Sequence, residues 1–119
     1  MPSNHPLRVS LILPSYKRPL LLLRTVRAFA SQLCCNDEII IIVHSSDPFR
    51  DNYDKLIKEI RTNCQVRLIS NPSNNLCHSY NLGLKAASNE ILLFSDDGCI
   101  PDEHLVENHL SVIGVMERR

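Results

Sequence analysis

Glycine is scarce in this sequence and tryptophan is absent. Only three of the 119 residues are glycines, and none lies near Pro14, where the first apolar run ends. The phosphate-binding loop that usually follows the first strand of a nucleotidyltransferase is basic and rich in glycine, so that its backbone N–H groups can approach the phosphates. A nucleotidyltransferase is therefore a poorly favoured function for this chain.

Long hydrophobic runs are missing as well. No run approaches the roughly 18–20 apolar residues that are needed to cross a bilayer, and the polar residues 1–6 do not open a signal peptide. We expect no transmembrane segment. The expected location is cytoplasmic, or peripheral to the cytoplasmic face of the membrane at most.

The cysteines and the charges exclude further classes of protein. The five cysteines are odd in number and include no Cys-x-x-Cys pair, which argues against a disulfide framework and a zinc ribbon. We expect them to be small hydrophobic groups in a reducing compartment. Thirteen basic and thirteen acidic side chains cancel, so no overall field favours nucleic acid as a partner.

Four short apolar runs are the main structural signal in the sequence. Their β-branched residues and their lack of polar alternation are typical of parallel strands that are covered on both faces. They recur about every 25–30 residues, which leaves room for one helix in each gap. The predicted strands are Val9–Leu13, Ile39–Val43, Val66–Ile69 and Ile91–Phe94.

Helical periodicity in the gaps, and after the last strand, completes the fold prediction. The predicted helices span residues 19–33, 51–60, 75–87 and 101–113, with Asp51 or Asn52 as the cap of the second. The third places Leu76, Tyr80, Leu84 and Ala87 at helical spacing, as one apolar face. The sequence therefore predicts one α/β domain over residues 1–119, a three-layer open sheet of mostly parallel strands.

In such a sheet, ligands bind outside the carboxyl ends of the strands. The sharpest feature at these ends is the acidic turn Asp96-Asp97-Gly98, directly after the fourth strand. Adjacent carboxylates repel each other, and a hard divalent cation with a diphosphate would relieve that repulsion. Asp and Gly also favour ordinary solvated turns, so the pair by itself leaves both interpretations open.

The ordered set of motifs resembles the family 2 glycosyltransferases. The run from Val9 to Arg18 matches the opening of that family, a hydrophobic strand that ends in a Pro-Ser-Tyr type turn. Asn75, Asn81 and Gly83, then the acidic turn and Pro101, follow the family's order and spacing. The resemblance covers nearly all of residues 7–113. It implies a Rossmann-like fold, the N-terminal half of a GT-A glycosyltransferase, which binds a nucleotide-diphosphate sugar.

The resemblance also implies roles for single residues. Ser15 and Tyr16 would hold the nucleobase and ribose, and Arg18 would approach the diphosphate with a bidentate guanidinium. Asp96 would contact the ribose or nucleotide. Asp97 would ligate a divalent metal, Mg²⁺ or Mn²⁺, that bridges the diphosphate and stabilises the leaving nucleotide.

Pro14, His44 and Asn81 complete the predicted nucleotide-sugar-binding set, and two positions depart from the family's pattern. His44 stands where an aspartate usually recognises the base, although Asp47 follows nearby. Gly98 stands where the acidic turn often carries a further acid. The first departure puts base recognition in question, whereas Asp97 stays the expected metal ligand, because some family members carry a neutral residue after the two aspartates.

Family members are generally much longer, and their second half supplies the acceptor site and, in inverting enzymes, the general base. The sequence is therefore interpreted as a truncated donor domain whose missing C-terminal half lies in a longer frame or in a partner chain. An alternative is a non-catalytic nucleotide-sugar-binding module or a degenerate relic. Apolar surface left uncovered by the missing half predicts marginal stability or self-association.

Overall fold

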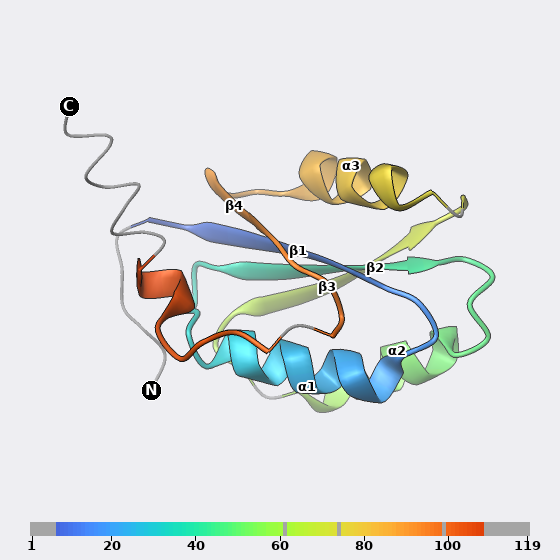
Figure 1. The fold of residues 1–119 in the computed structure, drawn as a ribbon, viewed down its shortest axis with the longest axis horizontal. Helices are drawn as coiled ribbons and strands as arrows, with labels where there is room; N and C mark the ends of the chain where they lie inside the picture. The colour runs from blue at the N-terminus through green and yellow to red at the C-terminus, as the bar shows by residue number, and fades with distance from the viewer. Residues whose placement is uncertain (1–6, 61, 74, 99, 109–119) are drawn as a thin grey trace.

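The computed structural model describes residues 7–60, 62–73, 75–98 and 100–108, in which strands and helices alternate along the chain (Figure 1). The elements are β1 (Val9–Ser15), α1 (Pro19–Ala30), β2 (Glu38–His44), α2 (Arg50–Glu59), β3 (Gln65–Asn71), α3 (Leu76–Ala86) and β4 (Ile91–Phe94). All four predicted strands are present, and β1, β2 and β3 are each longer than their apolar run. The predicted α/β fold is confirmed.

The four strands form one parallel sheet in the order β3-β2-β1-β4. The chain moves outward from β1 to β2 and β3, then crosses to the other side of β1 to form β4. The direction of strand progression therefore reverses between β1 and β4. Such a switch point is where open α/β sheets bind their ligands, beyond the carboxyl ends of the strands.

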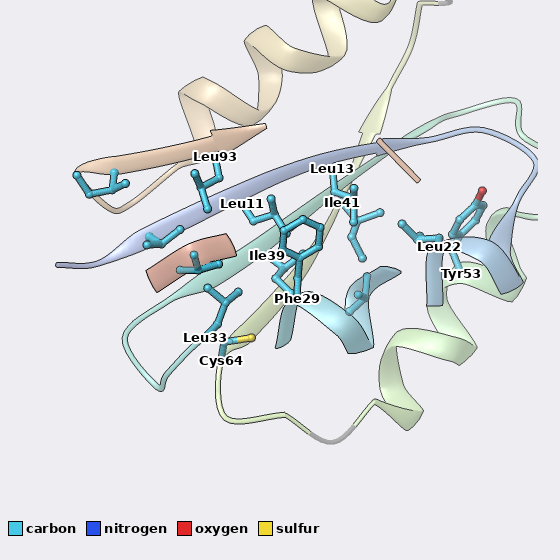
Figure 2. Packing of buried hydrophobic residues seen from close by; sticks show 14 of the residues in the cluster. Leu11, Leu13, Leu22, Phe29, Leu33, Ile39, Ile41, Tyr53, Cys64 and Leu93 are labelled. Carbon is cyan, nitrogen blue, oxygen red and sulfur yellow. The ribbon is translucent and has the colours of Figure 1, made fainter. Parts of the chain in front are cut away.

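Helices cover both faces of the sheet, with α1 and α2 on one side and α3 on the other (Figure 1). The larger apolar cluster lies on the α1 side, where Phe29 and Leu33 pack onto Leu11 and Ile39 of the sheet (Figure 2). Alternate residues of the same strands, including Ile12 and Ile42, form the smaller cluster on the α3 side. Burial on both faces explains why the strands read as continuous apolar runs.

The predicted apolar face of α3 is only partly right: Tyr80 and Ala87 pack against the smaller cluster, but Leu76 and Leu84 do not. Ser79 and Gly83 are the buried residues of this helix, whereas Leu76 and Leu84 are 59% and 48% exposed. A Cβ atom placed on Gly83 would lie only 2.9 Å from Cδ1 of Ile42. At these two positions small side chains face the sheet, because the helix backbone runs too close to it for leucine.

Two helix boundaries also differ from the prediction. α2 begins at Arg50 after Phe49, so neither Asp51 nor Asn52 caps it, whereas the Asn75 side chain caps α3 by accepting from the N–H groups of Cys77 and His78. The helix predicted for residues 101–113 is represented by helical residues 105–108, and its remainder lies outside the described residues. None of the described helices is long and apolar enough to cross a membrane.

Candidate functional site

The turns that follow the parallel strands meet at one edge of the sheet, as predicted. Oγ of Ser15, at the end of β1, donates to Oδ2 of Asp97 over 2.9 Å. The rings of Tyr16 and His44, the latter at the end of β2, meet edge to face with centroids 6.3 Å apart. Beyond His44, the N–H of Ser45 donates to the carbonyl of Asn71 at the end of β3.

Asp97 is held at this edge by hydrogen bonds and an ion pair. The residue is only 8% exposed, and its Oδ2 accepts from Oγ of Ser15 at 2.9 Å and from the N–H of Tyr16 at 3.4 Å. Its Oδ1 faces Nη1 of Arg18 at 3.7 Å. One carboxylate oxygen therefore fixes the β1–α1 turn, while the other faces the exposed guanidinium of Arg18.

Asp96 has a different environment from its neighbour. Its side chain is exposed, and its Oδ1 accepts from the N–H of Gly98, which closes the acidic turn locally. The carbonyl of Asp97 accepts from Oγ1 of Thr25 on α1, which anchors the turn to that helix. The two adjacent acids therefore project from a fixed backbone into different surroundings.

The β1–α1 turn is held by side chains from three other segments. The N–H groups of Tyr16, Lys17 and Arg18 donate in order to Oδ2 of Asp97, Oδ2 of Asp47 (2.7 Å) and the hydroxyl of Tyr53 (3.0 Å). Lys17 adopts a left-handed conformation, φ 55°, which is uncommon for a side chain other than glycine. The turn therefore depends on its three acceptors to hold this shape.

A cavity of about 340 Å³ opens beside this turn, within the usual size range for small-ligand pockets. An aromatic ring and an aliphatic side chain provide apolar surface, while hydroxyls and an imidazole provide hydrogen-bonding groups. It is lined by Ser15, Tyr16, His44, Ser73, Leu76 and Ser79. None of the described residues that line it carries a carboxylate, so it suits an uncharged ring better than a cation.

His44 has a defined tautomer when it is neutral. Its Nδ1 lies 3.2 Å from the backbone N of Ser46. A backbone N–H can only donate, so Nδ1 must be the unprotonated nitrogen and the ring proton is assigned to Nε2. The imidazole can therefore donate a hydrogen bond, which the aspartate usual in the family cannot do.

Most of the predicted site residues lie together. Ser15, Tyr16, Arg18, His44 and Asp97 are joined by the contacts above, Asp96 lies next in the chain, and Pro14 is buried within β1 beside Ile42 of β2. Asn81 is exposed on α3 and is not part of the cavity lining. The ligand-binding roles of these residues stay predictions.

Sequence analysis missed the parts that Asp47 and Tyr53 play in this site. The sequence suggests Asp47 only as a substitute in base recognition, but its carboxylate accepts hydrogen bonds from the N–H groups of Lys17 and Phe49. Tyr53 packs in the larger apolar cluster (Figure 2), yet its hydroxyl also reaches the β1–α1 turn. The one available signal was the hydroxyl itself, because a buried tyrosine oxygen needs a partner.

Solved structures share this fold. The mannosyltransferase PcManGT from Pyrobaculum calidifontis, in complex with GDP-Man and Mn²⁺, matches with a TM-score of 0.78 at 17% identity. S. aureus TarS 1-349 in complex with UDP matches with a TM-score of 0.75 at 16% identity. Each match covers 90% of this chain but only 32% of the other, so the chain spans about a third of these relatives.

Sequence comparison assigns the family. No curated protein sequence matches the chain significantly. The model of the family described as glycosyl transferase family 2, however, matches residues 10–115, nearly the whole sequence. That range contains β1 from Ser10 onward, all of β2, β3 and β4, the β1–α1 turn and the acidic turn. The chain belongs to glycosyl transferase family 2.

Proposed function

We propose that this chain is the donor-binding part of a glycosyltransferase, and that it binds a nucleotide-diphosphate sugar together with a divalent metal ion. One observation carries the proposal: the cavity walled by Tyr16 and His44 adjoins the Arg18–Asp97 ion pair. A ring-binding cavity beside a cation and an acid is what a nucleoside with a diphosphate requires. The solved relatives described with UDP, UDP-GlcNAc or GDP-Man support this assignment.

In this proposal the nucleobase enters the cavity and stacks on the ring of Tyr16, a residue that is 50% exposed and whose ring has Nζ of Lys17 5.0 Å from its centroid in the ligand-free chain. Nε2 of His44 donates to a carbonyl or ring nitrogen on the edge of the base. The diphosphate then lies toward Arg18, whose exposed guanidinium can leave Asp97 and bind two phosphate oxygens. Asp96, exposed on the acidic turn, is available to the ribose.

Among the predicted site residues, Asp97 is the one that we assign as a ligand of the divalent ion. No group of three His, Cys, Asp or Glu side chains that could hold a metal occurs among the described residues. Protein atoms alone would therefore hold an ion weakly, and the diphosphate must supply the other ligands, as is common for Mg²⁺ at phosphate sites. Oδ1 of Asp97 is the oxygen available for this role, because Oδ2 already accepts two hydrogen bonds. A bound ion would stabilise negative charge on the departing nucleotide.

The acceptor site and the general base belong, in this proposal, to sequence that this chain does not contain. The chain spans only 32% of the solved relatives. Glycosyl transfer therefore needs a C-terminal half or a partner chain. A non-catalytic nucleotide-sugar-binding module remains the second candidate, favoured by Gly98 at a position that is often acidic in the family.

Titration calorimetry with UDP, GDP and dTDP, with Mn²⁺ or with EDTA, tests the proposal. We expect at least one nucleotide to bind, more tightly with Mn²⁺ than with EDTA. Asp97→Asn should remove the difference, because the amide keeps the shape of the side chain and loses its charge. Asp54→Asn, which makes the same change on an exposed residue of α2, is the matched control and should keep the difference.

The possible failures are distinguishable. Equal affinities with Mn²⁺ and EDTA would exclude the metal while leaving nucleotide binding intact. Absence of binding by all three nucleotides, in a chain that circular dichroism shows to be folded, would overturn the donor-site proposal. Sugar transfer after addition of the missing half would show that the chain is part of an enzyme and is not a non-catalytic binding module.

A further inference from the structure

A directional chain of hydrogen bonds connects α2 to the acidic turn. The single proton of the Ser15 hydroxyl is donated to Oδ2 of Asp97. Oγ of Ser15 must therefore be the acceptor in its 2.9 Å contact with the Tyr53 hydroxyl, and Tyr53 must donate. The Tyr53 oxygen in turn accepts from the N–H of Arg18. The order of donation is Arg18 N–H, Tyr53 hydroxyl, Ser15 hydroxyl, Asp97 carboxylate.

Tyr53 itself cannot touch a ligand. Its side chain is completely buried, and it lies beside Leu22 at one end of the larger apolar cluster (Figure 2). Burial raises the pKa of its hydroxyl against the opposing effect of its hydrogen bonds to Ser15 and Arg18, which keeps the group a neutral donor. Any effect of Tyr53 on binding must therefore pass through the residues that it holds.

Tyr53 holds both ends of the β1–α1 turn. It contacts Ser15 before the turn and the N–H of Arg18 after it, with the left-handed Lys17 between them. Such a backbone conformation persists only where its surroundings fix it. Within the described residues, no buried side-chain nitrogen or oxygen lacks a partner. Removing the Tyr53 hydroxyl would take the acceptor from the Arg18 N–H and the donor from Oγ of Ser15.

We propose that Tyr53 is a positioning residue of the nucleotide site, which acts through Ser15 on the Asp97 carboxylate and through Arg18 on the diphosphate-facing turn. Its effect on ligand binding rests on the function proposed above. Its effect on the geometry of the site does not. Polarised hydrogen-bond chains strengthen their members, so the Tyr53 donor helps the Ser15 proton to fix Oδ2 of Asp97, leaving Oδ1 directed outward.

Amide hydrogen exchange in the ligand-free chain tests the geometry. Tyr53→Phe keeps the buried ring and removes only the hydroxyl. The Arg18 amide loses its acceptor directly, so the informative amide is Tyr16, which is bonded to Asp97 and not to Tyr53. We expect its exchange to accelerate about fivefold, the change that corresponds to the net contribution of one hydrogen bond.

Ser15→Ala serves as a second variant, because it breaks the same chain of hydrogen bonds without disturbing the packing of Tyr53. It should accelerate exchange at Tyr16 to a similar extent. Tyr80→Phe is the matched control, since this tyrosine lies on α3 and packs edge to face against Phe94. If Tyr53→Phe accelerates exchange at Arg18 alone, the positioning role is wrong.

A double-mutant cycle measured with UDP and Mn²⁺ tests the consequence for binding. Tyr53→Phe should weaken UDP about tenfold in the wild-type background and have little further effect in Asp97→Asn, because its main route to the ligand is then lost. An equal loss in both backgrounds would overturn the route through Asp97. If the wild type binds no UDP, the proposed function fails, and the exchange experiment still decides the role of Tyr53.

Discussion

Glu38 offers the most demanding test of how this fold is held together. It lies at the start of β2, only 3% exposed. Its Oε2 accepts from Oγ of Ser10 and from the N–H of Ser88, both at 2.6 Å, and its Oε1 accepts from Nη1 of Arg67 at 3.1 Å. Since Arg67 also donates to the carbonyl of Ala86, one carboxylate connects three strands with the end of α3.

The effect of Glu38→Gln can be estimated from these contacts. Breaking a buried ion pair typically costs about 3–5 kcal/mol, and we expect about 3 kcal/mol because Arg67 is partly exposed and can regain water. The glutamine amide also brings an N–H₂ group toward partners that are all donors. For a chain of this size, such a loss lowers Tm by about 12 °C.

The stability difference between wild type and Glu38→Gln should depend on pH. Burial raises the pKa of Glu38, but the hydrogen bonds from Ser10 and Ser88 and the ion pair with Arg67 outweigh it, so the pKa lies below its ordinary value of 4.5. A lowered pKa in the folded state stabilises the fold above the unfolded-state pKa. That contribution is lost as the pH falls through the lowered value, so the difference should shrink below about pH 4.5.

Thermal unfolding followed by circular dichroism at pH 7 and pH 4 measures both effects. Glu90→Gln is the matched control, because Glu90 pairs only with Arg8 across an exposed surface, and it should melt like the wild type at pH 7. The reasoning is refuted if Glu38→Gln melts within about 2 °C of the wild type at pH 7, or if the difference grows as the pH falls.

Three further predictions follow from the cavity, the α3 contact and the uncovered surface. Tyr16→Ala should weaken UDP by about 1–3 kcal/mol whether or not Mn²⁺ is present, and calorimetry showing a loss only with Mn²⁺ would contradict its contact with the base. Gly83→Ala should lower the free energy of unfolding by about 1–2 kcal/mol, because crowding against Ile42 outweighs the helix-propensity gain; an equal or higher melting temperature would refute this. Leu84 and Phe94, 48% and 53% exposed, should promote self-association, which a monodisperse, highly stable monomer in light scattering and thermal melts would disprove.

The sheet could be predicted from the sequence because strand burial is a local property. Every residue from Ile39 to Val43 is apolar and buried, so the run itself reports a strand covered on both faces. The face of α3 could not be predicted in the same way. Periodicity ranks Leu84 above Gly83 as an inward residue, but the distance between helix and sheet decides the outcome, and only small residues fit here.

The candidate site likewise contains residues whose position could be predicted from the sequence and one, Tyr53, whose position could not. Chain order and fold class suffice to place the segments of Ser15 and Asp97 at the same edge, because both lie at the carboxyl ends of strands of one parallel sheet. The contribution of Tyr53 required knowledge of where α2 packs and which way its phenol points. Its partners are 38 residues away at Ser15 and 35 at Arg18, so no local pattern of sequence could identify them.

The charges at the site explain why metal dependence is the decisive property to measure. In the ligand-free chain, Arg18 lies 3.7 Å from Oδ1 of Asp97. A diphosphate bound beside them adds at least two negative charges, and like charges about 4 Å apart repel by about 4 kcal/mol at an effective dielectric of ~20. One guanidinium cannot neutralise the carboxylate and both phosphates, whereas a divalent ion between them would turn that repulsion into attraction. Affinity for UDP that rises with Mn²⁺ in the wild type, and not in Asp97→Asn, is therefore the expected result if the Asp97 carboxylate faces the phosphates.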